Sequence, residues 1–209
     1  MPFPLHLQKI TLQNHCVGLF VPDADAVKEL YQKGENAFPF WSQLWPAALA
    51  LSEFLVLHSH YIKNKNVLEL GAGLGLPSII AAPYAASVLC TDLIPEAVNI
   101  AKRSAGYNHL RNFKTAVISW QHLPVDLKAD VLLLSDVNYE PSAFDALMEM
   151  LGKFLQKETT VILGTPQRLM AKGFIAHLLH HCIEQTEMAI TYSGETVPIS
   201  VFVLRSKQE

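Results

Sequence analysis

The sequence contains few cysteines and no long hydrophobic run, and each shortage argues against a class of protein. Its 209 residues include three cysteines, Cys16, Cys90 and Cys182, an odd number without the spacing of metal ligands. A disulfide-stabilised fold is therefore not expected, whereas a reducing compartment is. The longest apolar runs, such as residues 131–134, are too short to span a bilayer. Because the amino terminus also lacks a signal-peptide pattern, we expect a cytoplasmic protein without a membrane partner.

Concentrated positive charge is also missing. The 16 lysines and arginines are outnumbered by 19 acidic residues, and no stretch gathers the basic ones together. A nucleic-acid partner is therefore not expected. His177 and His181 lie four residues apart but have no further ligand beside them, so no metal site is predicted. Half of the residues are hydrophobic and 17% are charged, which favours a single domain with a well-buried sheet.

The first 60 residues predict an extension followed by a helix. Residues 4–21 alternate loosely and are interrupted at residues 13–15, as in a β-hairpin. Asp23 or Asp25 could cap a short helix that ends near Gly34. After an aromatic segment that contains Trp41 and Trp45, Pro46 predicts the first turn of a helix that runs to about His58.

From residue 67 onward, short apolar runs alternate with helical patterns. This alternation predicts an α/β fold, with a mostly parallel sheet covered by helices on both faces. The chain should then close with an antiparallel hairpin around residues 193–195. The expected strands are residues 67–70, 87–91, 114–118, 131–135, 159–164, 186–192 and 198–204, and the last two helices are expected near 142–155 and 168–181.

A glycine-rich turn is the sharpest motif of the chain. Gly71, Gly73 and Gly75 follow a strand directly and precede a helix. Glycine allows the backbone to turn tightly and lets a ligand approach closely. The spacing G-x-G-x-G differs from the G-x-G-x-x-G of dinucleotide-binding folds, and Pro77 falls in the first helical turn. An NAD-dependent dehydrogenase is therefore a weaker hypothesis.

Two acidic residues accompany this turn. Glu69 lies near the end of the first core strand, where a carboxylate suits a cationic ligand group better than a pyrophosphate. Asp92 ends the next strand, where an acid can accept hydrogen bonds from ribose hydroxyls. Together with the turn, these residues predict binding of S-adenosylmethionine. The alternative is a purely structural turn with two solvated acids.

Four segments in order resemble methyltransferase family 16, the nicotinamide N-methyltransferase-like group that contains many protein lysine methyltransferases. They are residues 44–48 (Leu-Trp-Pro-Ala-Ala), 67–77 with the glycine-rich turn, 118–120 (Ile-Ser-Trp) and 135–140 (Ser-Asp-Val-Asn-Tyr-Glu). The resemblance implies a Rossmann-like, seven-strand class I methyltransferase sheet that takes S-adenosylmethionine and releases S-adenosylhomocysteine. Both terminal hairpins fit this family. We expect one methyltransferase domain over residues 1–209, with an extension at 1–40 and the core at 41–209.

The resemblance also implies roles for single residues. The family's D-x-x-Y motif falls on Asp136 and Tyr139, which would shape the substrate pocket: Asp136 could orient or deprotonate an amine, and Tyr139 could hold it. Capping of a loop by Asp136 and packing of Tyr139 are the structural alternatives. Trp120 would lie near the adenine, where many relatives carry an acid at the preceding position and this chain has Ser119. Trp45 would lie over the methionine end of the cofactor or at the substrate entrance, and Ser135 completes the expected cofactor site. Core packing is the alternative for Trp45 and Trp120.

The methyl acceptor is not defined by these motifs. The resemblance favours a protein substrate, modified on a lysine side chain. A small-molecule N-methyltransferase on the same scaffold is an alternative. A non-catalytic module that binds S-adenosylmethionine and a partner is a third possibility, although the intact Glu69, Asp92 and Asp136 argue against it.

Overall fold

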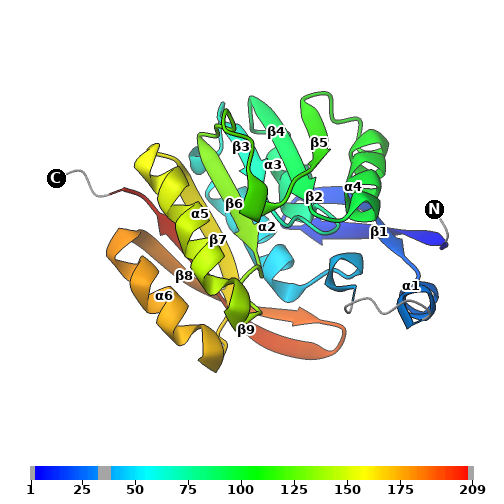
Figure 1. Ribbon diagram of the computed structural model, residues 1–209. Helices are drawn as coiled ribbons and strands as arrows, with labels where there is room; N and C mark the ends of the chain where they lie inside the picture. Colours follow the sequence, from blue (N-terminus) through cyan, green and yellow to red (C-terminus); the bar gives the residue numbers. More distant parts are fainter. Residues whose placement is uncertain (1–2, 33–38, 207–209) are drawn as a thin grey trace.

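The computed structural model describes residues 3–32 and 39–206 and is built on a seven-stranded sheet (Figure 1). The strand order is β5-β4-β3-β6-β7-β9-β8, with β9 antiparallel to both of its neighbours and the other pairings parallel. The expected sheet with an antiparallel strand near one edge is therefore confirmed. Its strands are β3 (Asn66–Glu69), β4 (Ser87–Asp92), β5 (Phe113–Val117), β6 (Val131–Ser135), β7 (Thr160–Pro166), β8 (Cys182–Tyr192) and β9 (Glu195–Leu204).

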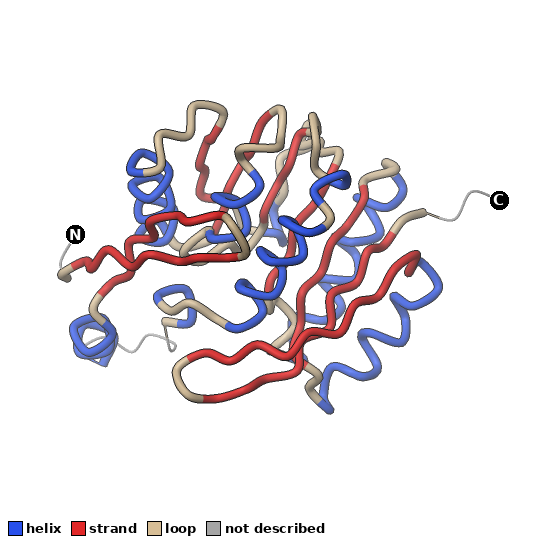
Figure 2. Tube along the Cα trace, turned by 180° about the vertical axis from the view of Figure 1, so that it is seen from behind, coloured by secondary structure: helices blue, strands red, loops and turns tan. Residues whose placement is uncertain are grey.

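Helices cover both faces of this sheet, as the alternating pattern predicted. One face carries α2 (Pro46–Leu57), α3 (Leu76–Ala81) and α4 (Pro95–Tyr107), and the opposite face carries α5 (Phe144–Gln156) and α6 (Lys172–Leu178). Figures 1 and 2 show these two layers from opposite sides. A proline occupies one of the first two positions of α2, α3 and α4, where its missing N–H costs no helical hydrogen bond.

The central strand β6 shows how the core is divided. Its run Val-Leu-Leu-Leu is fully buried because both faces of the strand are covered. Val131 and Leu133 pack into the cluster beneath α2, α3 and α4, whereas Leu132 and Leu134 pack against α5 and α6. Alternate side chains of one strand therefore stabilise two separate halves of the core.

The amino-terminal hairpin is confirmed as a separate two-stranded sheet of β1 (Leu5–Leu12) and β2 (His15–Pro22). It lies on the α2–α4 side of the large sheet (Figure 2). The helix α1 (Ala24–Gln32) follows, and the Asp23 carboxylate accepts the N–H of Ala26 at 2.9 Å, so Asp23 caps it. Its expected end near Gly34 lies outside the described residues.

The segment 168–181 differs from the expected single helix. It consists of a 3-10 turn at Leu169–Ala171, the short α6 and a second 3-10 turn at Leu179–His181. The described residues contain no helix long and apolar enough to cross a membrane.

Candidate active site

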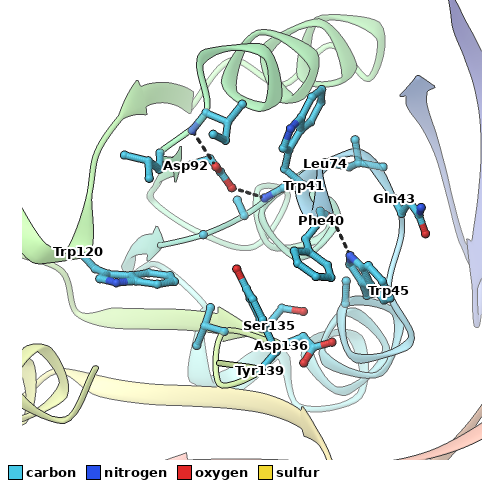
Figure 3. Close-up of a pocket in the computed structure, with 18 of the residues that line it drawn as sticks. Phe40, Trp41, Gln43, Trp45, Leu74, Asp92, Trp120, Ser135, Asp136 and Tyr139 are labelled. Carbon is cyan, nitrogen blue, oxygen red and sulfur yellow. Dashed lines mark hydrogen bonds between the residues drawn. The ribbon is translucent and has the colours of Figure 1, made fainter. Parts of the chain in front are cut away.

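A cavity of about 790 Å³ opens at the carboxyl ends of the parallel strands (Figure 3). Its walls include the segments that follow β3, β4, β5, β6 and β7, together with the aromatic segment before α2. The crossover from β3 to β6 reverses the strand order, and ligands of open α/β sheets bind beside such a reversal. Nine of the ten predicted site residues line this cavity: Trp45, Gly71, Gly73, Gly75, Asp92, Trp120, Ser135, Asp136 and Tyr139.

The glycine-rich turn forms one wall because its glycines adopt conformations that other residues avoid. Gly71, Gly73 and Gly75 have φ values of 65°, 54° and 75°. A Cβ on Gly71 would approach the ring of Trp120 to 2.9 Å, and a Cβ on Gly73 would approach the carbonyl oxygen of Trp41 to 3.2 Å. The lack of side chains at these positions therefore allows the Trp120 ring and the Trp41 backbone to pack closely against the turn.

Most amides of this turn are already used by the protein itself. The N–H of Gly73 donates to the Asp92 carboxylate at 2.8 Å, and that of Gly75 donates to the Ala72 carbonyl at 2.8 Å. The N–H of Ser78 donates to Glu69 at 3.0 Å, and Pro77 has no N–H. A pyrophosphate requires several free amides at the start of the helix. The turn is therefore poorly suited to a dinucleotide.

Asp92 is the last residue of β4 and lines the cavity. Besides the Gly73 N–H, its carboxylate accepts the N–H of Ile94 at 2.9 Å (Figure 3). Burial raises the pKa of this carboxyl, and the two backbone hydrogen bonds act in the opposite direction. Each oxygen retains a further lone pair, so the group could also accept hydrogen bonds from ribose hydroxyls.

Glu69 is placed differently from the expectation. It is fully buried behind the turn and is not part of the cavity wall, so the structure provides no direct contact with a ligand's cationic group. One oxygen accepts the Ser78 N–H, whereas Oε1 has no hydrogen-bond partner among the described residues. Burial raises the pKa of this carboxyl to about 8. Its visible role is to hold the start of α3 beneath the turn.

Trp120 combines a place in the cavity wall with packing against the core. Its ring lines the cavity beside Gly71 and also packs against the core beneath α5. The hydroxyl of Ser119 accepts the N–H of Gln121 at 3.2 Å and so caps the short turn that begins with Trp120. Ser119, which stands where many relatives carry an acid, thus stabilises the start of its own turn.

Aromatic side chains form the opposite wall (Figure 3). The ring of Phe40 lies 4.9 Å from that of Tyr139 and 6.1 Å from that of Trp45, measured between centroids. The indole N–H of Trp45 donates to the Phe40 carbonyl at 2.8 Å, which fixes this wall at the start of α2. Phe40 and Tyr139 remain 41% and 38% exposed, so this wall reaches the mouth of the cavity.

Asp136 has a partner that the sequence analysis missed. Arg168 lies two residues after the end of β7. Both of its Nη atoms donate to the Asp136 carboxylate, so the two side chains form a two-point ion pair. Both side chains line the cavity. The position of Arg168 just after a predicted strand was the signal that could have revealed it. Because β6 and β7 are parallel neighbours, their carboxyl ends meet at the same edge of the sheet.

The charges of the described cavity wall are mostly negative. Asp92, Asp136 and Glu140 carry carboxylates, and Arg168 is the single lysine or arginine. This balance suits a cationic ligand such as a sulfonium better than a phosphate. Together with the volume, which lies in the range of about 300–1,000 Å³ typical of small-ligand sites, the residues present fit S-adenosylmethionine.

Comparison with known proteins supports this assignment. Residues 28–181 match the model of the family described as lysine methyltransferase, methyltransferase family 16. The chain belongs to this family. S-adenosylmethionine is therefore the cofactor to which the fold corresponds, and the resemblance noted in the sequence is confirmed.

Curated relatives from this lysine methyltransferase family modify proteins, according to their names. The human electron transfer flavoprotein beta subunit lysine methyltransferase is 32% identical over 73% of this chain and 59% of its own length. Human histone-arginine methyltransferase METTL23 is 32% identical over 56% of this chain and 65% of its own length. Bovine protein-lysine methyltransferase METTL21E is 38% identical over 57% of this chain and 45% of its own length. The chain thus spans about half to two thirds of the length of these relatives.

Solved structures show the same fold at low identity. The N-methyltransferase NodS from Bradyrhizobium japonicum, in complex with S-adenosylhomocysteine, superimposes with a TM-score of 0.63 at 16% identity, covering 85% of this chain and 97% of that one. Trm5b from Pyrococcus abyssi superimposes with a TM-score of 0.61 at 13% identity, covering 96% and 56%. These likenesses support the class I methyltransferase fold.

Proposed function

We propose that this protein is an S-adenosylmethionine-dependent N-methyltransferase whose acceptor is a lysine side chain of another protein. The observation that carries this proposal is the wall of Phe40, Trp45 and Tyr139, which leads from the mouth of the cavity to Asp136. A long cationic side chain could enter along aromatic faces, which attract ammonium groups. The name of the family and those of the flavoprotein and METTL21E relatives favour the same class of acceptor, whereas METTL23 is named for arginine.

The cavity residues divide into two groups in this proposal. Asp92 would hold the ribose of the cofactor, and Trp120 would lie beside its adenine. Ser135 and the turn from Gly71 to Gly75 would contact the remainder. When bound, S-adenosylmethionine supplies a methyl group whose bond to sulfur breaks as the new bond to nitrogen forms, and the bonding electrons stay on the sulfur.

Asp136 and Tyr139 would act on the acceptor. Transfer requires a nitrogen with a free lone pair, held in line and shielded from water, so positioning supplies most of the rate. The Asp136 carboxylate, which is held by Arg168, would accept an N–H of the acceptor. The Tyr139 hydroxyl points into the cavity (Figure 3), and burial raises the pKa of this phenol, so it stays a neutral hydrogen-bonding group.

Transfer of a labelled methyl group tests the proposal. Purified protein would be incubated with tritiated S-adenosylmethionine and cell lysate, and labelled polypeptides would be hydrolysed to identify the methylated amino acid. We expect methyllysine in a polypeptide, lost with Asp136→Asn and retained with Glu149→Gln, an exposed acid on α5 outside the cavity wall. Methylarginine would show that the acceptor is an arginine side chain, as in the name of METTL23, and not a lysine. Label confined to small molecules, or no transfer despite cofactor binding, would overturn the proposal.

A further inference from the structure

Arg168 holds the Asp136 carboxylate with a specific geometry. Its Nη1 donates to Oδ1, and its Nη2 donates to Oδ2 at 3.0 Å. This hydrogen bonding raises the pKa of Arg168 further, so the guanidinium stays charged. A planar guanidinium that meets both carboxylate oxygens fixes orientation as well as charge, which a lysine cannot reproduce.

The backbone delivers the two side chains to this contact. Asp136 has a φ of 53°, and its N–H donates to the Gly164 carbonyl of β7 at 2.9 Å. The N–H of Arg168 donates to the Pro166 carbonyl at 2.8 Å, which turns the chain back toward β6. The ion pair is thus part of how the ends of β6 and β7 are joined.

Arg168 provides the one positive charge that balances the nearly buried Asp136 in the described cavity wall. The Asp136 side chain is 9% exposed and that of Arg168 is 29% exposed. The other ionisable groups of the described wall are Asp92 at the end of β4 and Tyr139 and Glu140 after β6, none of which is a cation. Without Arg168, the nearly buried Asp136 would be left unpaired beside further acids.

We propose that Arg168 is a positioning residue that keeps the acceptor nitrogen neutral by occupying Asp136. This inference rests on the proposed function. An unpaired carboxylate would stabilise the ammonium form of an incoming amine, and an ammonium has no lone pair to receive a methyl group. Paired with Arg168, Asp136 can still accept an N–H through its remaining lone pairs, but it no longer holds the acceptor as a cation.

Binding of n-butylammonium, a mimic of the lysine side chain, tests this inference without turnover. Calorimetry on protein saturated with S-adenosylhomocysteine would compare wild type, Arg168→Gln, and Arg168→Gln combined with Asp136→Asn. We expect about tenfold tighter binding by Arg168→Gln, since a nearby carboxylate shifts an amine by about one pKa unit or more. The double variant should lose this gain. Lys172→Gln, which removes an exposed charge of α6 outside the cavity wall, should match wild type.

The kinetic signature is equally distinctive. With a labelled polypeptide as acceptor, Arg168→Gln should lower both kcat and KM, and raising the pH should restore the rate because the trapped ammonium then loses its proton. A merely structural defect would raise KM and weaken S-adenosylhomocysteine binding. If Arg168→Gln binds n-butylammonium no more tightly than wild type, the inference is wrong. Absence of transfer by wild type would instead refute the proposed function, while the binding comparison still decides the role of Arg168.

Discussion

At the scale of single residues, Glu69 supports the glycine-rich turn from the side that faces away from the cavity. It is fully buried, and one carboxylate oxygen accepts the Ser78 N–H at 3.0 Å. Which side of the glycine-rich turn the carboxylate occupies depends on three-dimensional packing, and the structure places it behind the turn with Ser78. The residue therefore belongs to the support of the site.

This burial predicts an unusual pH dependence of stability. The folded protein holds the Glu69 proton up to a pKa of about 8, whereas the ordinary value is 4.5. Between these values the unfolded chain releases a proton that the folded protein keeps, so stability falls as the pH rises. Denaturant unfolding at several pH values should show this fall in wild type and a weaker one in Glu69→Gln. Parallel curves for the two proteins would show that Glu69 does not titrate in this window.

Gly73 is the residue of the turn at which substitution is most informative. Alanine there would need a φ of 54°, at a cost of about 1–2 kcal/mol, with its Cβ only 3.2 Å from the Trp41 carbonyl oxygen. Gly73→Ala should therefore lower stability and weaken S-adenosylhomocysteine binding by about tenfold or more, measured by calorimetry. Gly152→Ala in α5, where a Cβ meets nothing within 4 Å, should leave binding unchanged. Equal affinities for wild type and Gly73→Ala would contradict this role.

Asp136 and Arg168 show how far sequence reasoning reaches at this scale. The resemblance of four ordered segments to the family singled out Asp136 and Tyr139. Arg168 was not predicted as a site residue because no local motif contains it. Its contact with Asp136 follows from the pairing of β6 with β7. Contacts between distant segments are what single-sequence reasoning could not supply.

At the scale of elements, the amino-terminal hairpin was predicted correctly, but its docking site was not. Two side chains at the carboxyl end of α4 hold β2. Asn108, which follows the helix, accepts the N–H of Gly18 at 2.9 Å and donates to its carbonyl at 2.7 Å, and the Ser104 hydroxyl accepts the N–H of Phe20 at 3.0 Å. They satisfy backbone groups of β2 that a further strand would otherwise satisfy. Hydrophobic alternation alone could not reveal this attachment.

Removing Asn108 should therefore loosen the hairpin. Asn108→Ala loses both bonds to Gly18 and one to the Ser104 carbonyl, and we expect a loss of about 2 kcal/mol in unfolding free energy. S-adenosylhomocysteine affinity should change little, because the hairpin is not part of the cavity wall. Asn99→Ala, at an exposed position of α4, is the matched control. A similar stability for both variants would mean that apolar packing alone holds the hairpin.

At the scale of the whole molecule, the sheet was the most predictable feature. Alternating strand and helix patterns and the closing hairpin predicted a mostly parallel sheet with an antiparallel strand near one edge. The pattern is readable because the central parallel strands β3, β6 and β7 are almost entirely buried between two layers of helices. The location of the site also followed, since parallel strands direct their carboxyl ends to one edge. The aromatic wall was foreseen only in part: Trp45 and Tyr139 were singled out, whereas Phe40 was not, although it links the other two.

Every functional step depends on the cavity binding S-adenosylmethionine, so a calorimetric titration with S-adenosylhomocysteine and NAD tests the central claim most directly. Most amides of the turn already have acceptors, and the charges of the cavity wall are mostly negative, so a pyrophosphate finds few donors. We expect one S-adenosylhomocysteine to bind per chain and NAD to show no binding. Binding of NAD without S-adenosylhomocysteine would contradict the account and return the glycine-rich turn to the dinucleotide-binding class.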